Sequence, residues 1–544
     1  MRFEFDSGIR RSNLHLMFWR WVRAVKGMAT CRLRGVLSNV KTHIFAASPR
    51  KQVAHILIAT CFVYLLCHIF GNPFVGTDSY SELRTDCDSL RSRLYGTIDV
   101  PAAPDRRAIS ELWISLETIF KDNPPHPEKL EKKRFGEKKD NKEFPSAEEI
   151  RSHTHISARD ASACRDSHVA ITRGLTSYPQ SLFAKKGIVM LAGGRYSGFA
   201  PTGLGMLRET GSTLPVEVWM KDPVEERRGW CQELQQEGMA CRFLSDYMDV
   251  GVLKHGYQYK IFTILFSGFE QVLFLDADNV PVQNPDTVFA SEAFTSTGAV
   301  LWPDYWKSTS MPELPFIIGL SDGATTMLED ERTVESGQVA WDKSRHWKSL
   351  LLATYYNYYG PQVYYTLITQ GWAGWGDKDT FPMALRSLRQ KYSMIDTGEL
   401  KTLFVDGTVH GIGMLQADPS NLTHYQPMFM HSNIVKWSVR EFFCVGCASD
   451  AEEPITTSLF ENPGSAIHSH LKEHRRIFNI HDMQGWGIDP EPMMWRVMEQ
   501  TACRSVRKNK KLCKRVRKHM EKAFGFSFRT GRMTTFTGRD NPAC

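Results

Sequence analysis

Short apolar runs alternate with longer, more polar stretches from residue 186 onward. The apolar runs are rich in β-branched and aromatic residues and have the length of buried strands, while the stretches between them have the length of helices. The runs predict strands at 187–192, 214–219, 242–244, 272–275 and 299–302, and the intervening stretches predict helices at 257–269, 347–359 and 381–388. Alternation of this kind predicts an α/β domain in which crossover helices connect parallel strands.

The strand expected at 272–275 stops abruptly at Asp276 and Asp278. In α/β sheets the carboxyl ends of the strands form the edge where ligands bind. Alternate residues of an extended chain point the same way, so both carboxylates can hold one divalent cation together with a diphosphate. A solvated acidic turn is the alternative, because a bare Asp-x-Asp pattern often occurs by chance. The preceding strand and the following Pro281 and Pro285 favour the cation site.

A glycine turn follows the first expected strand. Gly193, Gly194 and Arg195 come directly after residues 187–192. Glycine lacks a Cβ, so a turn of this kind lets a nucleotide approach the backbone closely. A plain turn explains the same residues equally well, and the sequence leaves both interpretations open.

The first 70 residues differ in charge from the rest. Residues 1–52 contain eleven Lys or Arg and two acids, a net charge of +9, whereas all 544 residues together carry +7. Residues 53–70 contain no Asp, Glu, Lys or Arg and are long enough to span a bilayer as a helix. A buried core helix is the alternative. The positive-inside rule predicts a single-pass type II protein with a cytosolic tail and a lumenal C-terminal part.

Composition supports a large folded core, since 42% of the residues are hydrophobic and 11% are aromatic. Residues 71–184 have the texture of a stem, with one helix at 109–120 and a charge-dense run at 128–143 that is typical of a solvated spacer. The basic run at 504–522 predicts an exposed amphipathic helix. The expected organisation is a basic cytosolic tail at 1–52, a transmembrane anchor at 53–70, a lumenal stem at 71–184, a catalytic domain at 185–505 and a basic extension at 506–544.

Nine of the twelve cysteines lie beyond the expected anchor, in a compartment that permits disulfides. Cys231 and Cys241 are close enough in sequence to close a small loop. Because nine is an odd number, at least one thiol is free or pairs between chains. Cys444 and Cys447 have the spacing of metal ligands, but zinc is disfavoured without a second such pair. Asn421 begins a glycosylation sequon, which is meaningful in a lumenal domain.

Four segments between residues 186 and 503 carry a specific pattern. They are YKIFTILFSGFEQVLFLDADNVPVQNPDTVF from Tyr259, LWPDYWKST from Leu301, ESGQVAWDKSRHWKSLLLATYYNYYGPQVYY from Glu335 and GDKDTF from Gly376. This pattern resembles the fungal Golgi α-mannosyltransferases of the mannan-branching type, glycosyltransferase family 71. The last two segments are most similar to the members that add α-1,2 branches.

The resemblance implies a fold, a reaction and a setting. The fold is the GT-A-like nucleotide-sugar transferase fold, a Rossmann-like mixed sheet flanked by helices, behind an N-terminal membrane helix. The reaction is transfer of mannose from GDP-mannose to a mannosyl acceptor on glycoprotein or cell-wall mannan, with retention of the α configuration. The setting is the Golgi membrane, with the catalytic domain in the lumen, in complex with other mannosyltransferases and without a nucleic-acid partner.

The resemblance also implies roles in donor binding. Asp276 and Asp278 become ligands of Mn²⁺, His431 becomes the third ligand, and Lys436 lies beside it as a phosphate partner. Lys260 pairs either a phosphate or an acid of the fold. On the residues alone, a single histidine after apolar residues is more often a core or surface residue than a ligand.

Further carboxylates are candidates for contact with sugar. Asp377 and Asp379 are expected to face the transferred mannose, where a carboxylate stabilises an oxocarbenium-like transition state. Capping of the helix at 381–388 is the alternative role for these acids. Glu335 is expected to contact a hydroxyl group of the acceptor or sugar. Aromatic residues that can stack on sugar faces or pack in the core are Trp302, Tyr305, Trp306, Trp372 and Trp375.

Other functions stay open at this level. A lectin-like or scaffold protein keeps the fold without the chemistry, although an intact Asp276 and Asp278 pair argues against it. An enzyme that uses another nucleotide sugar, such as a UDP-sugar, is a second alternative, because a site for metal and diphosphate does not recognise the base. Transfer to form an α-1,3 linkage is a third.

Overall fold

The computed structural model describes most of the chain after residue 99. The described residues are 100–131, 133, 146–226, 229–320, 331–372, 374–395, 400–408, 411–422, 425–443, 463–479, 487–504, 510–528 and 532–533. The predicted cytosolic tail, the predicted anchor and the Cys444 and Cys447 pair lie outside them. Among the described residues, no helix is both long and apolar enough to cross a membrane. One compact unit comprises Ile98–Ala523.

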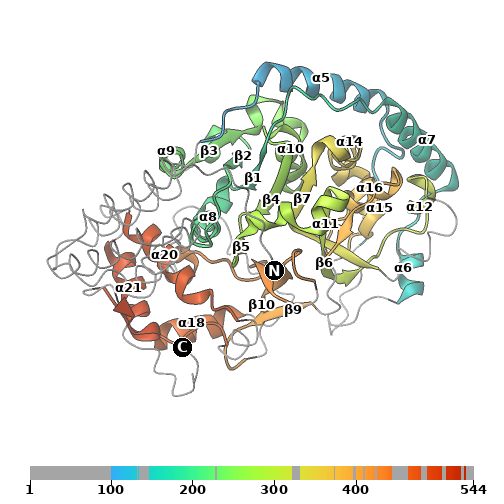
Figure 1. The fold of residues 1–544 in the computed structure, drawn as a ribbon. Helices are drawn as coiled ribbons and strands as arrows, with labels where there is room; N and C mark the ends of the chain where they lie inside the picture. Colours follow the sequence, from blue (N-terminus) through green and yellow to red (C-terminus); the bar gives the residue numbers. More distant parts are fainter. Residues whose placement is uncertain are drawn as a thin grey trace, which may run out of the picture. The chain divides into compact units, whose positions relative to one another are not determined.

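A seven-stranded mixed sheet forms the centre of this unit (Figure 1). Its strands are β1 (Lys186–Leu191), β2 (Val216–Met220), β3 (Met239–Phe243), β4 (Gln271–Asp276), β6 (Ala299–Lys307), β7 (Arg332–Asp342) and β8 (Ser393–Met394), in the order β3-β2-β1-β4-β7-β6-β8. The β3-β2-β1-β4 half is parallel, whereas β7 is antiparallel to both β4 and β6. The expected mixed α/β sheet is therefore confirmed. The sequence pattern did not predict β7, because polar residues such as Glu335 and Gln338 interrupt its apolar run.

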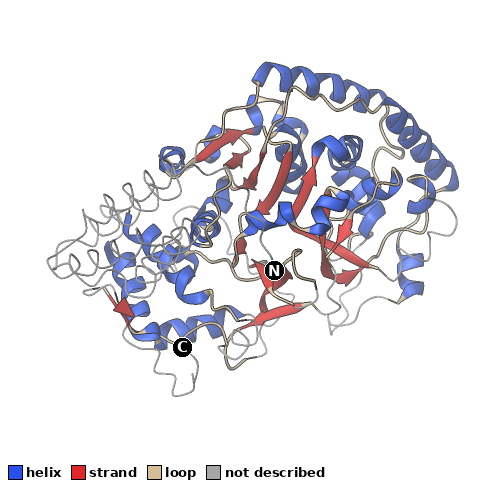
Figure 2. Cartoon of the chain, viewed as in Figure 1, coloured by secondary structure: helices blue, strands red, loops and turns tan. Residues whose placement is uncertain are grey.

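Both faces of the sheet are buried, which explains why residues 272–275 of the central strand β4 are all apolar. Val272 and Phe274 of β4 belong to one hydrophobic cluster, and Leu273 and Leu275 belong to another. The first cluster lies with helices α10 (Tyr259–Phe266), α12 (Leu314–Ile317), α14 (Lys343–Tyr358), α15 (Tyr365–Thr369) and α16 (Thr380–Ser387). The second lies with α8 (Ala200–Glu209), α9 (Trp230–Gln236) and α11 (Glu292–Thr297). Figure 2 shows the strands between these helices.

The compact unit begins earlier than the boundary expected at residue 185. Helices α5 (Arg106–Asp122), α6 (Ala147–His153) and α7 (Ala158–Gly174) precede β1. Helix α5 confirms the helix expected at 109–120, and its Trp113 lies with its ring centroid 5.1 Å from that of Phe262 in α10. Cys164 and Ile171 of α7 are buried in the same cluster. Helices α5 and α7 are therefore part of the core rather than of a stem, because one face of each is buried.

A second, four-stranded sheet follows the Asp-x-Asp turn. Its strands, in spatial order, are β5 (Asn279–Pro281), β11 (Pro427–His431), β10 (Gly411–Ala417) and β9 (Lys401–Phe404), and all neighbours are antiparallel. Strand β5 begins immediately after Asp278 and pairs with β11, so that Asn279 lies opposite His431. This pairing places the end of β11 beside the end of β4, although about 150 residues separate them in sequence.

The C-terminal part is helical and held by a disulfide. It contains α17 (Val439–Phe443), α18 (Pro463–Glu473), α20 (Glu491–Arg504) and α21 (Lys510–Phe524). Helix α21 is the predicted amphipathic helix, but it is not fully exposed, because Val516 and Met520 are buried. Cys503 and Cys513 form a disulfide that the sequence did not indicate. The predicted pairing of Cys231 with Cys241 is confirmed.

Candidate active site

Three predicted metal ligands converge at the carboxyl edge of the central sheet. Asp276 ends β4, Asp278 lies in the turn before β5, and His431 ends β11. One ligand atom from each lies within 4.8 Å of the other two. Ligands about 2.0–2.3 Å from a common cation fall within this separation. The geometry therefore suits one cation, and the β5–β11 pairing supplies the third ligand.

Asp278 is the more strongly paired of the two carboxylates in this group. Its carboxylate contacts the Nζ of Lys436, and its Oδ1 lies 3.3 Å from Nε2 of His431. Burial alone would raise the pKa of this carboxyl, but Lys436 and His431 outweigh burial and hold the pKa far below its usual value. Asp278 is thus an anion whose charge two cationic side chains share.

His431 lies between two carboxylates. Its Nδ1 is 2.7 Å from Oε1 of Glu335, on the opposite side of the ring from Asp278. Burial favours the neutral imidazole, yet Glu335 and Asp278 raise the pKa of His431 well above its usual value. The pKa of Glu335 is lowered, because His431 outweighs the effect of burial. Gly337 leaves room for this pair, since a Cβ there would lie 2.8 Å from both contacting atoms.

Lys260 connects the predicted cation ligands to Asp377, one of the acids expected to face the transferred mannose. Its Nζ lies 2.9 Å from Oδ2 of Asp276 and 3.3 Å from Oδ2 of Asp377, and it donates to the carbonyl oxygen of Ser336 at 2.8 Å. Burial opposes the charge on this ammonium, but the two carboxylates raise its pKa above the usual value. Burial raises the pKa of Asp276 to about 6, against the lowering effect of Lys260. Lys260 therefore pairs acids of the fold, the second of its two predicted roles.

The structure separates the two candidate acids of the GDKDTF segment. Asp377 faces Lys260 and accepts a hydrogen bond from Ser336 Oγ at 3.4 Å. Asp379 instead accepts from the backbone N–H of Val334 in β7 at 2.8 Å. It occupies the N-cap position of α16, but its side chain makes no capping bond. Only Asp377 shares the contact network of Asp276.

The charges of this network sum to a negative value that one divalent cation can balance. We define the site cluster as Asp276, Asp278, Glu335, Asp377, Lys260, Lys436 and His431. When His431 is neutral, as a metal ligand must be, four carboxylates face two ammonium groups. The net charge of the site cluster is then −2, and one divalent cation would neutralise it. Buried charge of one sign is costly unless it is paired or bound to metal.

The glycine turn lies at the same edge of the sheet, because Leu191 pairs with Asp276 across β1 and β4. Gly194 has a positive φ of 54°, which favours glycine. The space beside the Gly193 Cα is taken by Glu225, whose Oε2 would lie 2.1 Å from a Cβ there. The side chain of Arg195 lies outside the described atoms. Contact of this turn with a nucleotide stays a prediction, and Glu225 already explains the glycine at 193.

The predicted aromatic residues have different environments. Trp302 is completely buried and donates to the carbonyl of Ala417, so it belongs to the core. Trp375 is half-buried and lies within ring-contact distance of His255 and of Tyr257, which is 44% exposed. A Cβ on Gly376 would lie 2.9 Å from the Tyr257 ring. The rings of His255 and Tyr257 therefore lie beside Trp375 and Gly376, immediately before Asp377. The sequence did not point to His255 or Tyr257.

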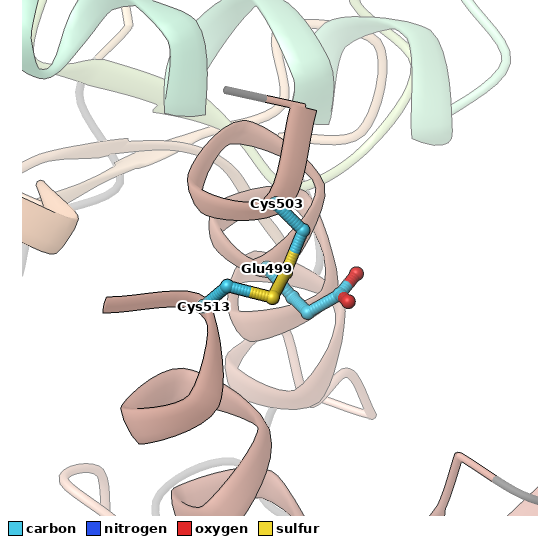
Figure 3. A group of neighbouring side chains, drawn as sticks. All are labelled: Glu499, Cys503 and Cys513. Atoms are coloured by element: carbon cyan, nitrogen blue, oxygen red, sulfur yellow. A yellow bond between two sulfur atoms is a disulfide. The ribbon is translucent and has the colours of Figure 1, made fainter. Parts of the chain in front are cut away.

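Another group resembles a metal site but is not one. Glu499, Cys503 and Cys513 bring their ligand atoms together (Figure 3). The two sulfur atoms are bonded to each other, so neither is available as a thiolate ligand.

The sequence analysis did not identify Ser336 and Gly337 as part of the site. Ser336 acts through its backbone carbonyl, and Gly337 acts through the absence of a side chain. Neither contribution has a signature in sequence.

Comparison with known proteins shows which class and which family the chain resembles. Residues 185–402 match the family model described as putative mannosyltransferase. Alpha-1,2-mannosyltransferase MNN22 of Candida albicans is 31% identical over 390 residues, which cover 63% of this chain and 65% of that protein. Alpha-1,2-mannosyltransferase MNN5 of Saccharomyces cerevisiae is 34% identical over 296 residues, which cover 44% and 50%. The matches thus span about half to two thirds of the length of these relatives.

These matches show that the protein resembles glycosyltransferases. Within that class, it is similar to the fungal α-1,2-mannosyltransferases, as the sequence segments from Tyr259 onward indicated.

Solved structures give only a weak likeness. The glycosyltransferase GlyE of Streptococcus pneumoniae aligns with a TM-score of 0.26 at 15% identity, over 39% of this chain and 45% of that chain. Galactosyltransferase LgtC, in complex with donor and acceptor sugar analogues, aligns with a TM-score of 0.24 at 12% identity, over 38% and 70%. Values this low do not identify a fold by themselves.

Proposed function

We propose that the protein is a divalent-cation-dependent α-mannosyltransferase with a GT-A-like catalytic domain. It transfers mannose from GDP-mannose to a mannosyl acceptor and forms α-1,2 linkages with retention of configuration. The observation that carries this proposal is the convergence of Asp276, Asp278 and His431 at the carboxyl edge of the sheet, in a chain whose residues 185–402 match a mannosyltransferase family model. The names of the relatives support the linkage.

The residues present fit a hard divalent cation. Two carboxylates and one imidazole form the ligand set, and the site cluster carries the negative charge to receive two positive charges. Carboxylate ligands favour Mg²⁺ or Mn²⁺, and the imidazole nitrogen favours Mn²⁺ over Mg²⁺. When bound, the cation neutralises the charge that builds on the leaving diphosphate.

The side chains around the cation site each have one task. Asp276, Asp278 and His431 hold the cation. Lys436 contacts Asp278 in this structure, and it would pair with the donor phosphates if Asp278 held the cation. Lys260 holds Asp377 beside the site. Asp377 stabilises the positive charge that develops on the transferred mannose, because a preorganised carboxylate acts most strongly where charge appears in the transition state.

The acceptor binds on the aromatic residues that precede Asp377. Tyr257 is exposed and Trp375 is half-buried, and Gly376 is packed against the Tyr257 ring. Aromatic faces present the flat apolar surface on which a pyranose ring stacks. The acceptor is a mannose-containing glycan of glycoprotein or cell-wall mannan.

The cellular setting follows from the N-terminal sequence. The uncharged run at 53–70, behind a tail with a net charge of +9, supports a single-pass type II protein of the Golgi membrane with a lumenal catalytic domain. Protease treatment of sealed vesicles tests this topology. The C-terminal part is expected to survive until detergent opens the vesicles, and its digestion in intact vesicles would refute the topology.

A donor screen tests the reaction. Purified full-length protein in detergent is incubated with a mannoside acceptor and GDP-mannose or a UDP-sugar, with Mn²⁺ or with excess EDTA. The expected result is mannosyl transfer from GDP-mannose with Mn²⁺ only, and a product that an α-1,2-specific mannosidase removes. Transfer from a UDP-sugar alone would refute the donor, and no transfer from any donor would favour a carbohydrate-binding protein. Full activity in EDTA would refute the cation.

A further inference from the structure

Glu335 is committed to protein contacts through both carboxylate oxygens. It is 5% exposed. Its Oε1 accepts from the backbone N–H of Gly337 at 2.6 Å and lies 2.7 Å from Nδ1 of His431. Its Oε2 accepts from Nε2 of Gln338 at 2.9 Å. These contacts argue against the sequence-based expectation that Glu335 binds a sugar hydroxyl, because its hydrogen-bonding positions face the protein.

The position of Glu335 is set by the same turn that carries the cation ligands. Gln338 donates to Glu335 and accepts from Nδ2 of Asn279 at 2.5 Å. Asn279 directly follows Asp278 and is completely buried, as is Gln338. A chain of buried amides therefore links the carboxylate of Glu335 to the backbone next to Asp278. Asn279 and Gln338 thereby restrain the carboxylate of Glu335.

The contact with Glu335 selects which nitrogen of His431 is available. A neutral imidazole carries one N–H and one lone pair, on different nitrogens. A carboxylate oxygen 2.7 Å from Nδ1 favours the proton on that nitrogen, because its negative charge attracts an N–H and repels a lone pair. The lone pair then lies on Nε2, which faces Oδ1 of Asp278 at 3.3 Å. Partners of this kind orient the histidines that bind metals and increase their basicity.

We propose that Glu335 is a positioning residue that holds His431 in the Nε2-ligating tautomer and thereby sets the affinity of the site for its divalent cation. The proposal rests on the proposed function insofar as it requires that cation. Glu335 touches neither the donor nor the acceptor. Its effect on turnover passes entirely through occupancy of the cation site.

Two variants of Glu335 and one of its neighbour test the proposal. Glu335→Ala removes the acceptor, whereas Glu335→Gln keeps an oxygen that can accept from Nδ1 without the charge. Gly337→Ala leaves Glu335 in place but inserts a Cβ 2.8 Å from both contacting atoms. Glu491→Gln is the matched control, because Glu491 is also a buried carboxylate that accepts backbone N–H groups, from Ile477 and Phe478.

Mn²⁺ binding to the full-length protein in detergent is measured by the electron paramagnetic resonance signal of free Mn²⁺, and turnover is measured against Mn²⁺ concentration. Glu335→Ala and Gly337→Ala are expected to weaken Mn²⁺ binding about 10- to 100-fold, the usual effect of losing a partner of a metal-ligating histidine. Glu335→Gln is expected to fall between wild type and Glu335→Ala. In all three variants, kcat recovers at saturating Mn²⁺, while the control binds Mn²⁺ as the wild type does.

The outcomes separate this proposal from the proposed function. If the wild type binds no Mn²⁺ and works in EDTA, the cation assignment itself is wrong. If the wild type binds Mn²⁺ and Glu335→Ala and Glu335→Gln bind it equally well, only the positioning role is wrong. If Mn²⁺ saturates these variants and kcat/KM for GDP-mannose stays low, Glu335 contacts substrate after all. Thermal unfolding of each variant identifies any that fails to fold, and Glu335→Gln, which preserves shape, then decides.

Discussion

Replacement of Lys260 by Met tests the buried ion pairs at the centre of the site. The change keeps the length of the side chain and removes the ammonium group. Lys260 is nearly buried, and its Nζ lies 2.9 Å from Asp276 and 3.3 Å from Asp377. Without it, two carboxylates remain in a buried environment with no ammonium between them. The protein is therefore expected to lose stability.

The size of the loss follows from these distances. Two charges about 3 Å apart interact by roughly 5 kcal/mol at an effective dielectric constant of about 20. Desolvation of the ammonium offsets much of this, and breaking a buried pair by removing one partner costs about 3–5 kcal/mol. At about 2.1 cal/mol/K for each residue, the unfolding entropy of a unit of this size, Ile98–Ala523, is about 0.9 kcal/mol/K. The expected fall in melting temperature is thus about 3–6 °C.

Thermal unfolding of the full-length protein is measured in EDTA and in excess Mn²⁺. The deficit of Lys260→Met is expected to shrink in Mn²⁺, because the cation supplies positive charge to Asp276. Lys348→Met is the matched control, since Lys348 is exposed on α14 and its loss should leave the melting temperature within about 1 °C. An unchanged melting temperature of Lys260→Met in EDTA would refute the reasoning.

Three further changes test other parts of the molecule. Asp278→Asn keeps size but removes a ligand charge, so turnover should fall at least about a hundredfold, and near-normal transfer by the folded variant would return the Asp-x-Asp turn to a structural role. Tyr257→Ala should raise the KM for the acceptor more than that for GDP-mannose, and the reverse result would move the acceptor elsewhere. Burial lowers the pKa of His168, beside Tyr356, to about 4. Because the folded state resists this protonation, stability should fall by up to about 3 kcal/mol as pH drops from 6.5 towards 4. Melting temperatures of His168→Gln should decline less over that range, and equal decline would refute the assignment.

Sequence reasoning worked best where local pattern and chemistry coincide. The apolar run before Asp276 predicted β4, because a strand buried on both faces must be apolar at every position. The helix at 109–120 was visible for a similar reason, since α5 has one apolar face and ends before a pair of prolines. The family resemblance implied roles for His431 and Lys436, which no local pattern connects to Asp278.

Sequence reasoning failed where a buried polar side chain is paired with another polar side chain, and where a helix is covered by distant helices. Strand β7 was not predicted, because it carries Glu335 and Gln338, which pair with other polar side chains rather than pack in a hydrophobic face. Helix α7 was assigned to the stem at 71–184, since its sequence does not show that α5 and α14 cover it. In both cases one partner lies far away in the chain, His431 for Glu335 and α14 for α7.

By itself, the sequence determined strands β1, β2, β4 and β6, the carboxylate pair at the end of β4, the Cys231–Cys241 disulfide and the resemblance to mannosyltransferases. Only the tertiary structure decided that His431 meets Asp278, that Lys260 joins Asp276 to Asp377, and that Glu335 faces His431 rather than solvent. Strand identity depends on neighbouring residues, which the sequence displays. Pairing of buried charges depends on which strand ends meet, and that is set by the packing of segments that lie up to about 150 residues apart.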